Sequence, residues 1–190
     1  MVCAEDAIAG AKDIIAESIS DEADYRSWIR KITMKKGKLI STAKDPEAES
    51  VYEMYYEFEE PLSKLAGHRI LALNRGEKEK ILTVKIEAPE EEILGYLEKQ
   101  IFHGKNLDTE QALKEAVEDS YKRLIGPAIE REIRSDLTEK AENGAIEVFG
   151  KNLHQLLMQP PITGQVVLGW DPAFRTGCKL AVVDPTGKVL

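Results

Sequence analysis

The sequence predicts a mostly α-helical fold with a small β component, and the chain ends in a β-hairpin. Apolar residues recur every three to four positions over several long stretches, which is the spacing that gives a helix one buried face. Residues 81–88 instead alternate apolar and polar side chains, as a half-buried strand does. The apolar runs 166–171 and 178–184 flank a loop that contains Pro172 and Gly177, which is a pattern typical of a hairpin. With 43% apolar and 32% charged residues, the composition suits a globular protein.

Two helices and a short strand are predicted at the start of the chain. Residues 5–19 and 22–36 each carry an apolar stripe at helical spacing. Gly37 is expected to end the second helix because glycine is a common helix terminator. Residues 38–43 then predict a short strand, and residues 44–47 a loop.

Short elements are expected in the following stretch. Residues 51–58 contain enough aromatic side chains for a strand, yet their glutamates also allow a helix, so both alternatives stay open. Residues 61–65 predict a short helix that begins at a proline, and Gly67 is expected to break it. Residues 68–74 predict a further helix.

The alternating strand 81–88 is the natural partner for the segment 38–43. Pro89 follows it and is expected to begin a helix, because proline fits the first helical position. The acidic residues 90–92 lie in the first turn of this helix, where the helix dipole favours negative charge.

Two long helices are predicted next. Asp108 has the character of an N-cap, and the helix that it begins is expected to end at residues 126–127, the sequence Gly-Pro. A second helix then runs to about Met158, with a weak point at residues 143–144, where it could kink or split. Residues 160–161, both proline, end the pattern, and a linker leads to the hairpin.

Composition and motifs exclude several classes of protein. No apolar run approaches the roughly 20 residues of a membrane span, and the start of the chain lacks the basic and apolar regions of a signal peptide. Cys3 and Cys178 lie at opposite ends of the chain, which fits a reducing cytoplasm better than a disulfide framework. There is no CxxC, no HExxH and no cysteine/histidine cluster, so neither a metal site nor a cofactor is expected.

Charge is distributed unevenly along the chain. The net charge of −8 argues against a dedicated nucleic-acid-binding module, although a local basic patch is compatible with it. The residues from 30 to 38 contain no acidic side chain, whereas residues 57–60 and 87–92 are acidic. Positive side chains are favourable near the C-terminus of a helix, so the first interpretation of this basic stretch is a solvated helix end. Weak contact with nucleic acid is the alternative interpretation. The candidate cations are Arg30, Lys31, Lys35, Lys36 and Lys38.

Five segments of the chain carry a resemblance to a known family: AIAGAKDIIAE (7–17), GHRILALNRG (67–76), YKRLIGPAIEREIR (121–134), NLHQLL (152–157) and GWDPAFRTGCKLAVVD (169–184). Together they resemble the bacterial transcription accessory protein family Tex. The resemblance implies a helical scaffold region with a small strand pair over residues 1–160. It also implies that residues 164–190 form the first strands of an incomplete YqgF-like domain of the ribonuclease-H-like fold. The family carries an RNA-binding S1 domain elsewhere, so we expect the chain to be a central piece of a longer protein.

The resemblance places Asp171 at the position of the first-strand acid of ribonuclease-H-like nucleases. Such enzymes hold two divalent ions, and hard cations need several oxygen ligands, so one carboxylate is not a site. We therefore expect Asp171 to be inactive, and Asp184 to serve the turn that follows it. Arg175 and Lys179 are further candidates for phosphate contact, with ordinary loop solvation as the alternative.

The resemblance implies a non-catalytic scaffold that positions flanking RNA- or DNA-binding modules in a cytoplasmic protein. RNA or DNA is the expected partner of the longer protein, and the transcription machinery is a further expected partner. We expect no association with a membrane. One alternative is a metal-dependent nuclease or resolvase whose site begins at Asp171. Another is a protein-interaction module that uses the acidic faces at 57–60 and 87–92. The apolar hairpin is expected to pack on the long helix near residues 153–157 or to pair with another chain.

Overall fold

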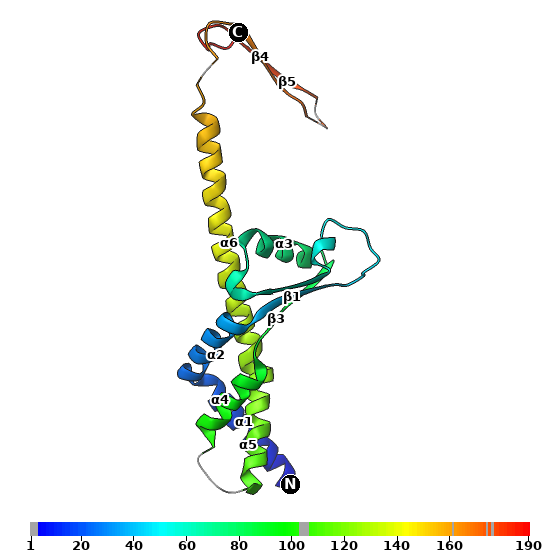
Figure 1. Cartoon of the computed structure of the whole chain (residues 1–190), viewed down its shortest axis with the longest axis vertical. Coiled ribbons are helices and arrows are strands. Elements are labelled where there is room, and N and C mark those ends of the chain that lie inside the picture. The colour runs from blue at the N-terminus through cyan, green and yellow to red at the C-terminus, as the bar shows by residue number, and fades with distance from the viewer. Residues whose placement is uncertain (1–3, 103–106, 161, 174, 176) are drawn as a thin grey trace. The chain divides into compact units, whose positions relative to one another are not determined.

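The computed structural model describes residues 4–102, 107–160, 162–173, 175 and 177–190, and Cys3 lies outside these ranges. The chain forms two compact units, residues 1–145 and residues 146–190. Helices make up most of it, and the strands form one sheet of three strands and one of two (Figure 1). The mostly helical fold with a small β component is therefore confirmed. None of the helices in the described part of the chain is both long and apolar enough to cross a membrane.

The larger sheet has β1 (Lys38–Ala43) at its centre, between β2 (Glu57–Pro61) and β3 (Leu82–Glu87). Both pairings are antiparallel, and the predicted pairing of 38–43 with 81–88 is confirmed. Alternation along β1 buries Leu39 and Ser41 against the helices. The sheet therefore contributes one face to the core of the first unit.

The ambiguous segment 51–58 divides between two elements. Its first part is a short 3₁₀ helix, η1 (Glu53–Tyr55), and its last residues begin strand β2. The turn η2 (Leu62–Lys64) and helix α3 (Gly67–Lys78) follow, so Gly67 begins this helix. A Cβ atom on Gly67 would lie 3.3 Å from the Cα of Ala141, so the start of α3 packs closely on the long helix α6.

Four helices surround the N-terminal half of the core: α1 (Ala4–Asp21), α2 (Ala23–Lys36), α4 (Glu90–Ile101) and α5 (Leu107–Asp119). Helix α5 begins at Leu107, so Asp108 lies within its first turn, and the side chain of Asp108 lies outside the described residues. The largest fully buried side chains in the unit include Ile29, Leu73, Leu82, Ile93, Leu97, Ile125 and Ile133.

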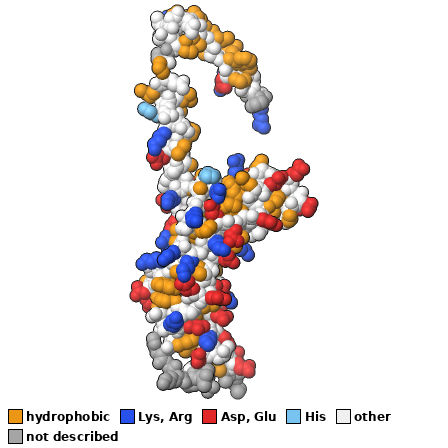
Figure 2. Space-filling model, in the orientation of Figure 1, with side chains coloured by type: hydrophobic (Ala, Val, Ile, Leu, Met, Phe, Trp, Pro, Cys, Tyr) orange, Lys and Arg blue, Asp and Glu red, His pale blue; other side chains and the backbone are white. Residues whose placement is uncertain are grey.

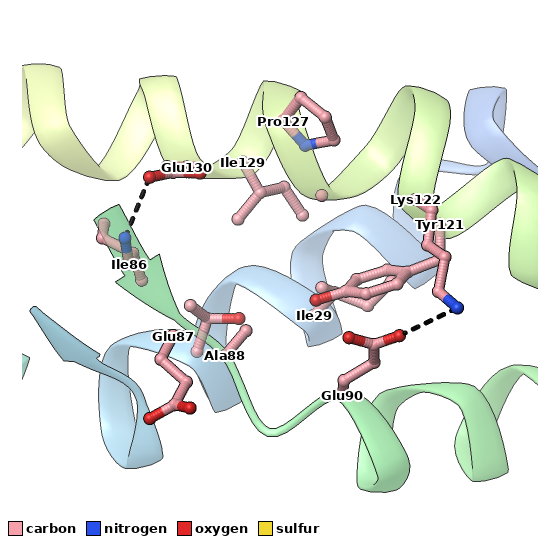
Figure 3. A pocket seen from close by; sticks show the side chains of 12 residues that line it. Ile29, Ile86, Glu87, Ala88, Glu90, Tyr121, Lys122, Pro127, Ile129 and Glu130 are labelled. Atoms are coloured by element: carbon pink, nitrogen blue, oxygen red, sulfur yellow. Dashed lines mark hydrogen bonds and ion pairs between the residues drawn. The ribbon is translucent and has the colours of Figure 1, made fainter. Parts of the chain in front are cut away.

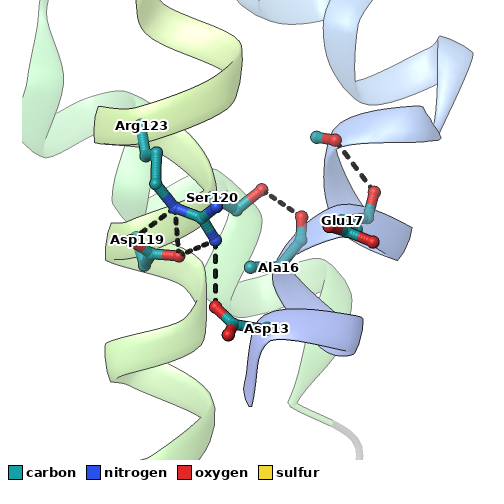
Figure 4. A network of polar contacts seen from close by, with 7 residues as sticks. Asp13, Ala16, Glu17, Asp119, Ser120 and Arg123 are labelled. Atoms are coloured by element: carbon teal, nitrogen blue, oxygen red, sulfur yellow. Dashed lines mark hydrogen bonds and ion pairs between the residues drawn. The ribbon is translucent and has the colours of Figure 1, made fainter. Parts of the chain in front are cut away.

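A polar network ties α1 to the turn that follows α5 (Figure 4). The buried hydroxyl of Ser120 donates a hydrogen bond of 2.7 Å to the carbonyl of Ala16. Arg123 bonds to Asp119 at 2.6 Å on its own helix and to Asp13 of α1 at 3.1 Å. The guanidinium of Arg123 lowers the pKa of the Asp119 carboxyl. These contacts fix how α1 lies on α5.

The predicted helix break at residues 126–127 is wrong. Helix α5 continues through a π-helical turn, Ser120–Ile125, directly into α6 (Gly126–Leu157). Pro127 has no backbone N–H, and its ring would clash with the carbonyl four residues earlier in a regular α-helix. A wider turn immediately before a proline relieves this clash, so the helix accommodates the proline without ending. The predicted weak point at residues 143–144 also does not interrupt α6.

The two parts of α6 differ in burial. Ile129, Ile133, Leu137 and Ala141 face the core of the first unit and are buried. Beyond Ala145 the apolar side chains are exposed, and Phe149 is 67% exposed. The apolar stripe of α6 therefore extends beyond the part that the core covers. Its exposed members are Ile146, Phe149, Leu153, Leu156 and Leu157.

The predicted hairpin is confirmed as β4 (Val167–Asp171) paired antiparallel with β5 (Lys179–Val183). Its apolar residues Leu168, Trp170 and Leu180 are all exposed. The structure therefore does not show these side chains covered by the long helix near residues 153–157. The alternative, pairing of the hairpin with another chain, stays a prediction.

Candidate nucleic-acid interface

Helix α2 and the start of β1 carry the candidate cations of the first unit, and three of the five are ion-paired. Arg30 pairs with Asp136 of α6. Lys36 lies 2.6 Å from Glu92 of α4, and Lys38 lies 2.6 Å from Glu59 of β2. The hydrogen bond to Glu59 raises the pKa of Lys38, so this ammonium stays charged.

The pairing of Arg30 belongs to a ladder between α2 and α6. Arg26 lies 2.7 Å from Glu132, one helical turn from the Arg30–Asp136 pair on both helices. Residues four apart share a helix face, so one face of α2 is turned toward acidic side chains of α6. These cations hold two helices together and are less available to a phosphate.

Lys31 and Lys35 lie one turn apart on α2, and both are exposed. Among the described residues neither forms an ion pair with a carboxylate. On the face shown in Figure 2, basic and acidic side chains are interspersed over the first unit. Lys31 and Lys35 are therefore the part of the basic stretch that can meet a phosphate without first breaking an ion pair.

The acidic faces are also engaged in ion pairs. Glu60 lies 2.7 Å from Arg69 and so gives this arginine a structural partner in the acidic stretch. Glu90 lies 3.4 Å from Lys122. Glu59 and Glu92 hold the cations of the basic stretch, so part of the negative charge of both faces is neutralised within the unit.

The hairpin candidates belong to the second unit and are considered by themselves. Asp171 lies directly opposite Lys179 in the antiparallel register of β4 and β5, and both residues are exposed. Opposite charges across a strand pair stabilise it modestly. Arg175 is exposed in the loop between the two strands. In the described ranges, no group of three or more His, Cys, Asp or Glu side chains is placed to hold a metal ion.

Asp184 acts in the turn after β5, as predicted. Its carboxylate accepts hydrogen bonds from the backbone N–H and the hydroxyl of Thr186, at 2.8 and 2.7 Å. The backbone N–H of Lys188 adds a third, at 3.0 Å. These bonds stabilise the ionised form and lower the pKa of Asp184, with the bond from the Thr186 hydroxyl as the largest cause.

A pocket between α2, the end of β3 and the π-helical turn was not predicted from the sequence. Ile29 and Thr33 line it from α2, Glu87 from the end of β3, and Tyr121 and Glu130 from the π-helical turn and α6 (Figure 3). Tyr121 belongs to the core and is 7% exposed, yet its ring also forms a wall of this pocket. The one signal in the sequence was the proline at 127 within a helical pattern, because such prolines accompany irregular helical turns.

Comparisons with known proteins agree with this architecture. Residues 3–149 match the Tex central region-like family, and residues 165–190 match the Tex protein YqgF-like domain. The protein YdcI of Bacillus subtilis (strain 168) is 59% identical over 98% of this chain and 26% of the relative. S1 RNA-binding domain-containing protein 1 of Homo sapiens is 31% identical over 98% of this chain and 20% of the relative.

A further relative is the Transcriptional accessory protein Tex of Neisseria gonorrhoeae. It is 30% identical over 98% of this chain and 26% of the relative. The chain thus spans between 20% and 26% of the length of these relatives.

Proposed function

The chain belongs to the Tex family, since the Tex central region-like family matches residues 3–149, and from this premise we propose that it is a non-catalytic scaffold of a transcription accessory protein. Its role is to carry the modules of the longer protein that bind RNA or DNA. The names of two relatives, an S1 RNA-binding domain-containing protein and a transcriptional accessory protein, support a nucleic-acid-associated role. The absence of a disulfide framework from the sequence fits a cytoplasmic location.

The observation that carries the proposal is the long helix α6. Its first part is held in the core of the first unit by Ile129, Ile133 and Leu137. The same helix continues to Leu157, beyond the region matched to the Tex central region and toward the segment matched to the YqgF-like domain. A helix fixed at one end by a core is a suitable support for a neighbouring module.

The environment of Asp171 supports a non-catalytic role. A two-metal nuclease needs several carboxylate oxygens around each ion. The residue opposite Asp171 in the strand register is Lys179, and a positive charge at this position disfavours a divalent cation nearby. Asp184, the other acidic residue at a strand end, already accepts three hydrogen bonds within its own turn. The nuclease or resolvase alternative therefore finds no support in these two side chains.

We further propose that the chain itself contacts nucleic acid weakly and without sequence preference, through Lys31 and Lys35. The test is fluorescence anisotropy with a labelled single-stranded RNA over a series of salt concentrations. Each phosphate that is neutralised contributes about 0.7 to the slope of log affinity against log salt. The double variant Lys31→Gln, Lys35→Gln should reduce the slope by up to about 1.4.

The matched control is Lys36→Gln, Lys38→Gln, which removes the same formal charge from cations that already pair with Glu92 and Glu59. This control should change the slope less than the Lys31 and Lys35 variant does. Equal effects of the two double variants would show that binding depends on overall charge alone, and would remove the assignment to Lys31 and Lys35.

Contact with the transcription machinery is the second part of the proposal, and the exposed stripe of α6 favours it. Ile146, Phe149 and Leu153 are exposed apolar side chains on one helix, and exposed apolar patches commonly mark protein-binding surfaces. Binding to purified RNA polymerase should be insensitive to salt and should fall in Phe149→Glu. If Phe149→Glu binds as well as the parent chain, the stripe is not the contact.

A further inference from the structure

The exposed stripe of α6 and the β4–β5 hairpin are two apolar surfaces of the same compact unit, residues 146–190. The structure shows both of them uncovered, since Phe149 of the stripe and Trp170 of the hairpin are each 67% exposed. A helix with an apolar face gains stability when this face is buried against another element, and an isolated two-stranded hairpin is marginal in water. Each surface therefore has the kind of partner that the other needs.

The exposed stripe of α6 is apolar and carries no formal charge. Its central members are spaced by three or four residues, which places them on one side of the helix. These members are Ile146, Phe149, Leu153 and Leu156. The formally charged residues between positions 146 and 157 are Glu147 and Lys151, and they pair with each other at 2.6 Å. At 3.6 residues per turn, this pair lies on the side of the helix opposite the stripe.

The hairpin presents one face of large apolar side chains. Residues directly opposite each other in an antiparallel pair share a face, and so do residues two apart on one strand. The register places Leu168 opposite Val182 and Trp170 opposite Leu180, so these four side chains lie on one face. Leu168, Trp170 and Leu180 are all exposed.

The two surfaces agree in length, and a short segment joins them. From residue 146 to residue 156 the stripe extends about 15 Å along the helix. A strand of five residues, as in β4 and β5, extends about 17 Å. The connecting segment 158–166 reaches at most about 30 Å. It is therefore long enough for the hairpin to fold back along the stripe.

We propose that the second unit has a closed form, in which the face of the hairpin that carries Trp170 packs on the exposed stripe of α6 around Phe149 and Leu153. Removal of apolar side chains from water on both surfaces favours closure. A short connecting segment gives an effective concentration in the millimolar range, so at micromolar protein the stripe meets its own hairpin rather than that of a second copy.

Closure regulates access to the stripe. A protein that binds the stripe, as proposed above for RNA polymerase, must first displace the hairpin. The closed form itself does not rest on that proposed contact, because the apolar side chains that favour it all belong to this chain.

The experiment is paramagnetic relaxation enhancement on the 190-residue chain, with a nitroxide on Cys178. Cys178 is exposed and directly precedes β5, and Cys3→Ser leaves it as the one thiol in the sequence. Relative to the reduced nitroxide, the closed form should lower the amide intensities of residues 146–157 by more than half. The amides of α1 should keep their intensity, because Ser120, which bonds to α1, lies about 39 Å along the continuous helix from Ile146.

Matched variants test the two surfaces separately. Phe149→Glu places a carboxylate on the stripe and should reduce the intensity loss at least threefold. Val148→Glu is its control, because Val148 is exposed but lies about 100° around the helix from Phe149. On the hairpin, Trp170→Glu should act as Phe149→Glu does. Ala181→Glu should have little effect, because Ala181 lies on the other face of the hairpin.

The variants of α6 keep the test valid even if the hairpin of Trp170→Glu does not fold. A mixture of nitroxide-labelled chains without ¹⁵N and unlabelled ¹⁵N chains detects contacts between copies. The proposal is overturned if this mixture loses as much intensity as the labelled chain alone, since a second copy would then cover the stripe. It is also overturned if residues 146–157 lose no intensity, or if Phe149→Glu and Val148→Glu behave alike. No polymerase is present in these samples, so failure of the closed form is distinct from failure of the proposed contact with RNA polymerase.

Discussion

Truncation of Ile133 to alanine tests whether the first part of α6 is fixed in the core. Ile133 is 0% exposed, and the substitution removes three carbon atoms from a fully buried side chain. At about 0.8 kcal/mol per buried methylene, the transfer cost alone is about 2.4 kcal/mol. The cavity that remains adds to this, so we expect a loss of about 3 to 4 kcal/mol in the free energy of unfolding.

Ile146 supplies a matched control on the same helix. It is 67% exposed, so Ile146→Ala removes the same atoms from a side chain that is largely in water. Alanine has the higher helix propensity, and the expected change in unfolding free energy is within about 0.5 kcal/mol.

Both variants are unfolded in urea, and the loss of helix is followed by far-UV circular dichroism. The slope of the unfolding free energy against urea concentration is fitted for each variant. The Ile133→Ala midpoint should fall at an unchanged slope, and the Ile146→Ala midpoint should stay near that of the parent chain. The reasoning is refuted if Ile133→Ala costs less than about 1 kcal/mol or if the two variants cost the same.

Other expected outcomes concern single contacts. Arg134→Met removes the guanidinium that lowers the pKa of Glu77 through a hydrogen bond, and should cost about 1 kcal/mol after allowance for solvent screening. The folded pKa of Glu77 lies below its ordinary value of 4.5, so this stability is present above that pH and is lost as the pH falls through the lowered pKa. The free energy of unfolding of Arg134→Met should therefore fall less on acidification than that of the parent chain. Asp184→Ala removes the acceptor of three hydrogen bonds, and the amide of Thr186 should exchange faster in hydrogen-exchange NMR; unchanged exchange would contradict this role. In Gly76→Ala the new Cβ would lie 2.6 Å from Cδ1 of a buried leucine, so the urea midpoint should fall despite the gain in helix propensity.

The helices and strands of the first unit could be predicted because their sequence patterns of apolar and polar side chains match the faces that are buried and exposed in the fold. Residues 38–43 and 81–88 became β1 and β3 because alternating side chains suit a sheet with one buried face. The helix break at residues 126–127 was predicted wrongly because glycine and proline usually end helices. Packing of Tyr121 and Ile125 against the core instead favours continuation through a π-helical turn.

The candidate site was less predictable, because its charges are paired across large separations in sequence. Arg26 and Arg30 meet Glu132 and Asp136, each 106 positions away in the chain. No local pattern reveals such partners, so the basic stretch looks more available in the sequence than it is in the fold. The pocket at Thr33 depends on an irregular helical turn, which local patterns also do not specify.

Incubation of labelled single-stranded RNA with the chain in magnesium or manganese, followed by native and denaturing gels, tests the central claim most directly. A non-catalytic scaffold that contacts nucleic acid through Lys31 and Lys35 predicts weak, salt-sensitive retardation with the RNA left intact, and less retardation in Lys31→Gln, Lys35→Gln. Metal-dependent cleavage that disappears in Asp171→Asn would contradict the account, as would tight binding that resists salt.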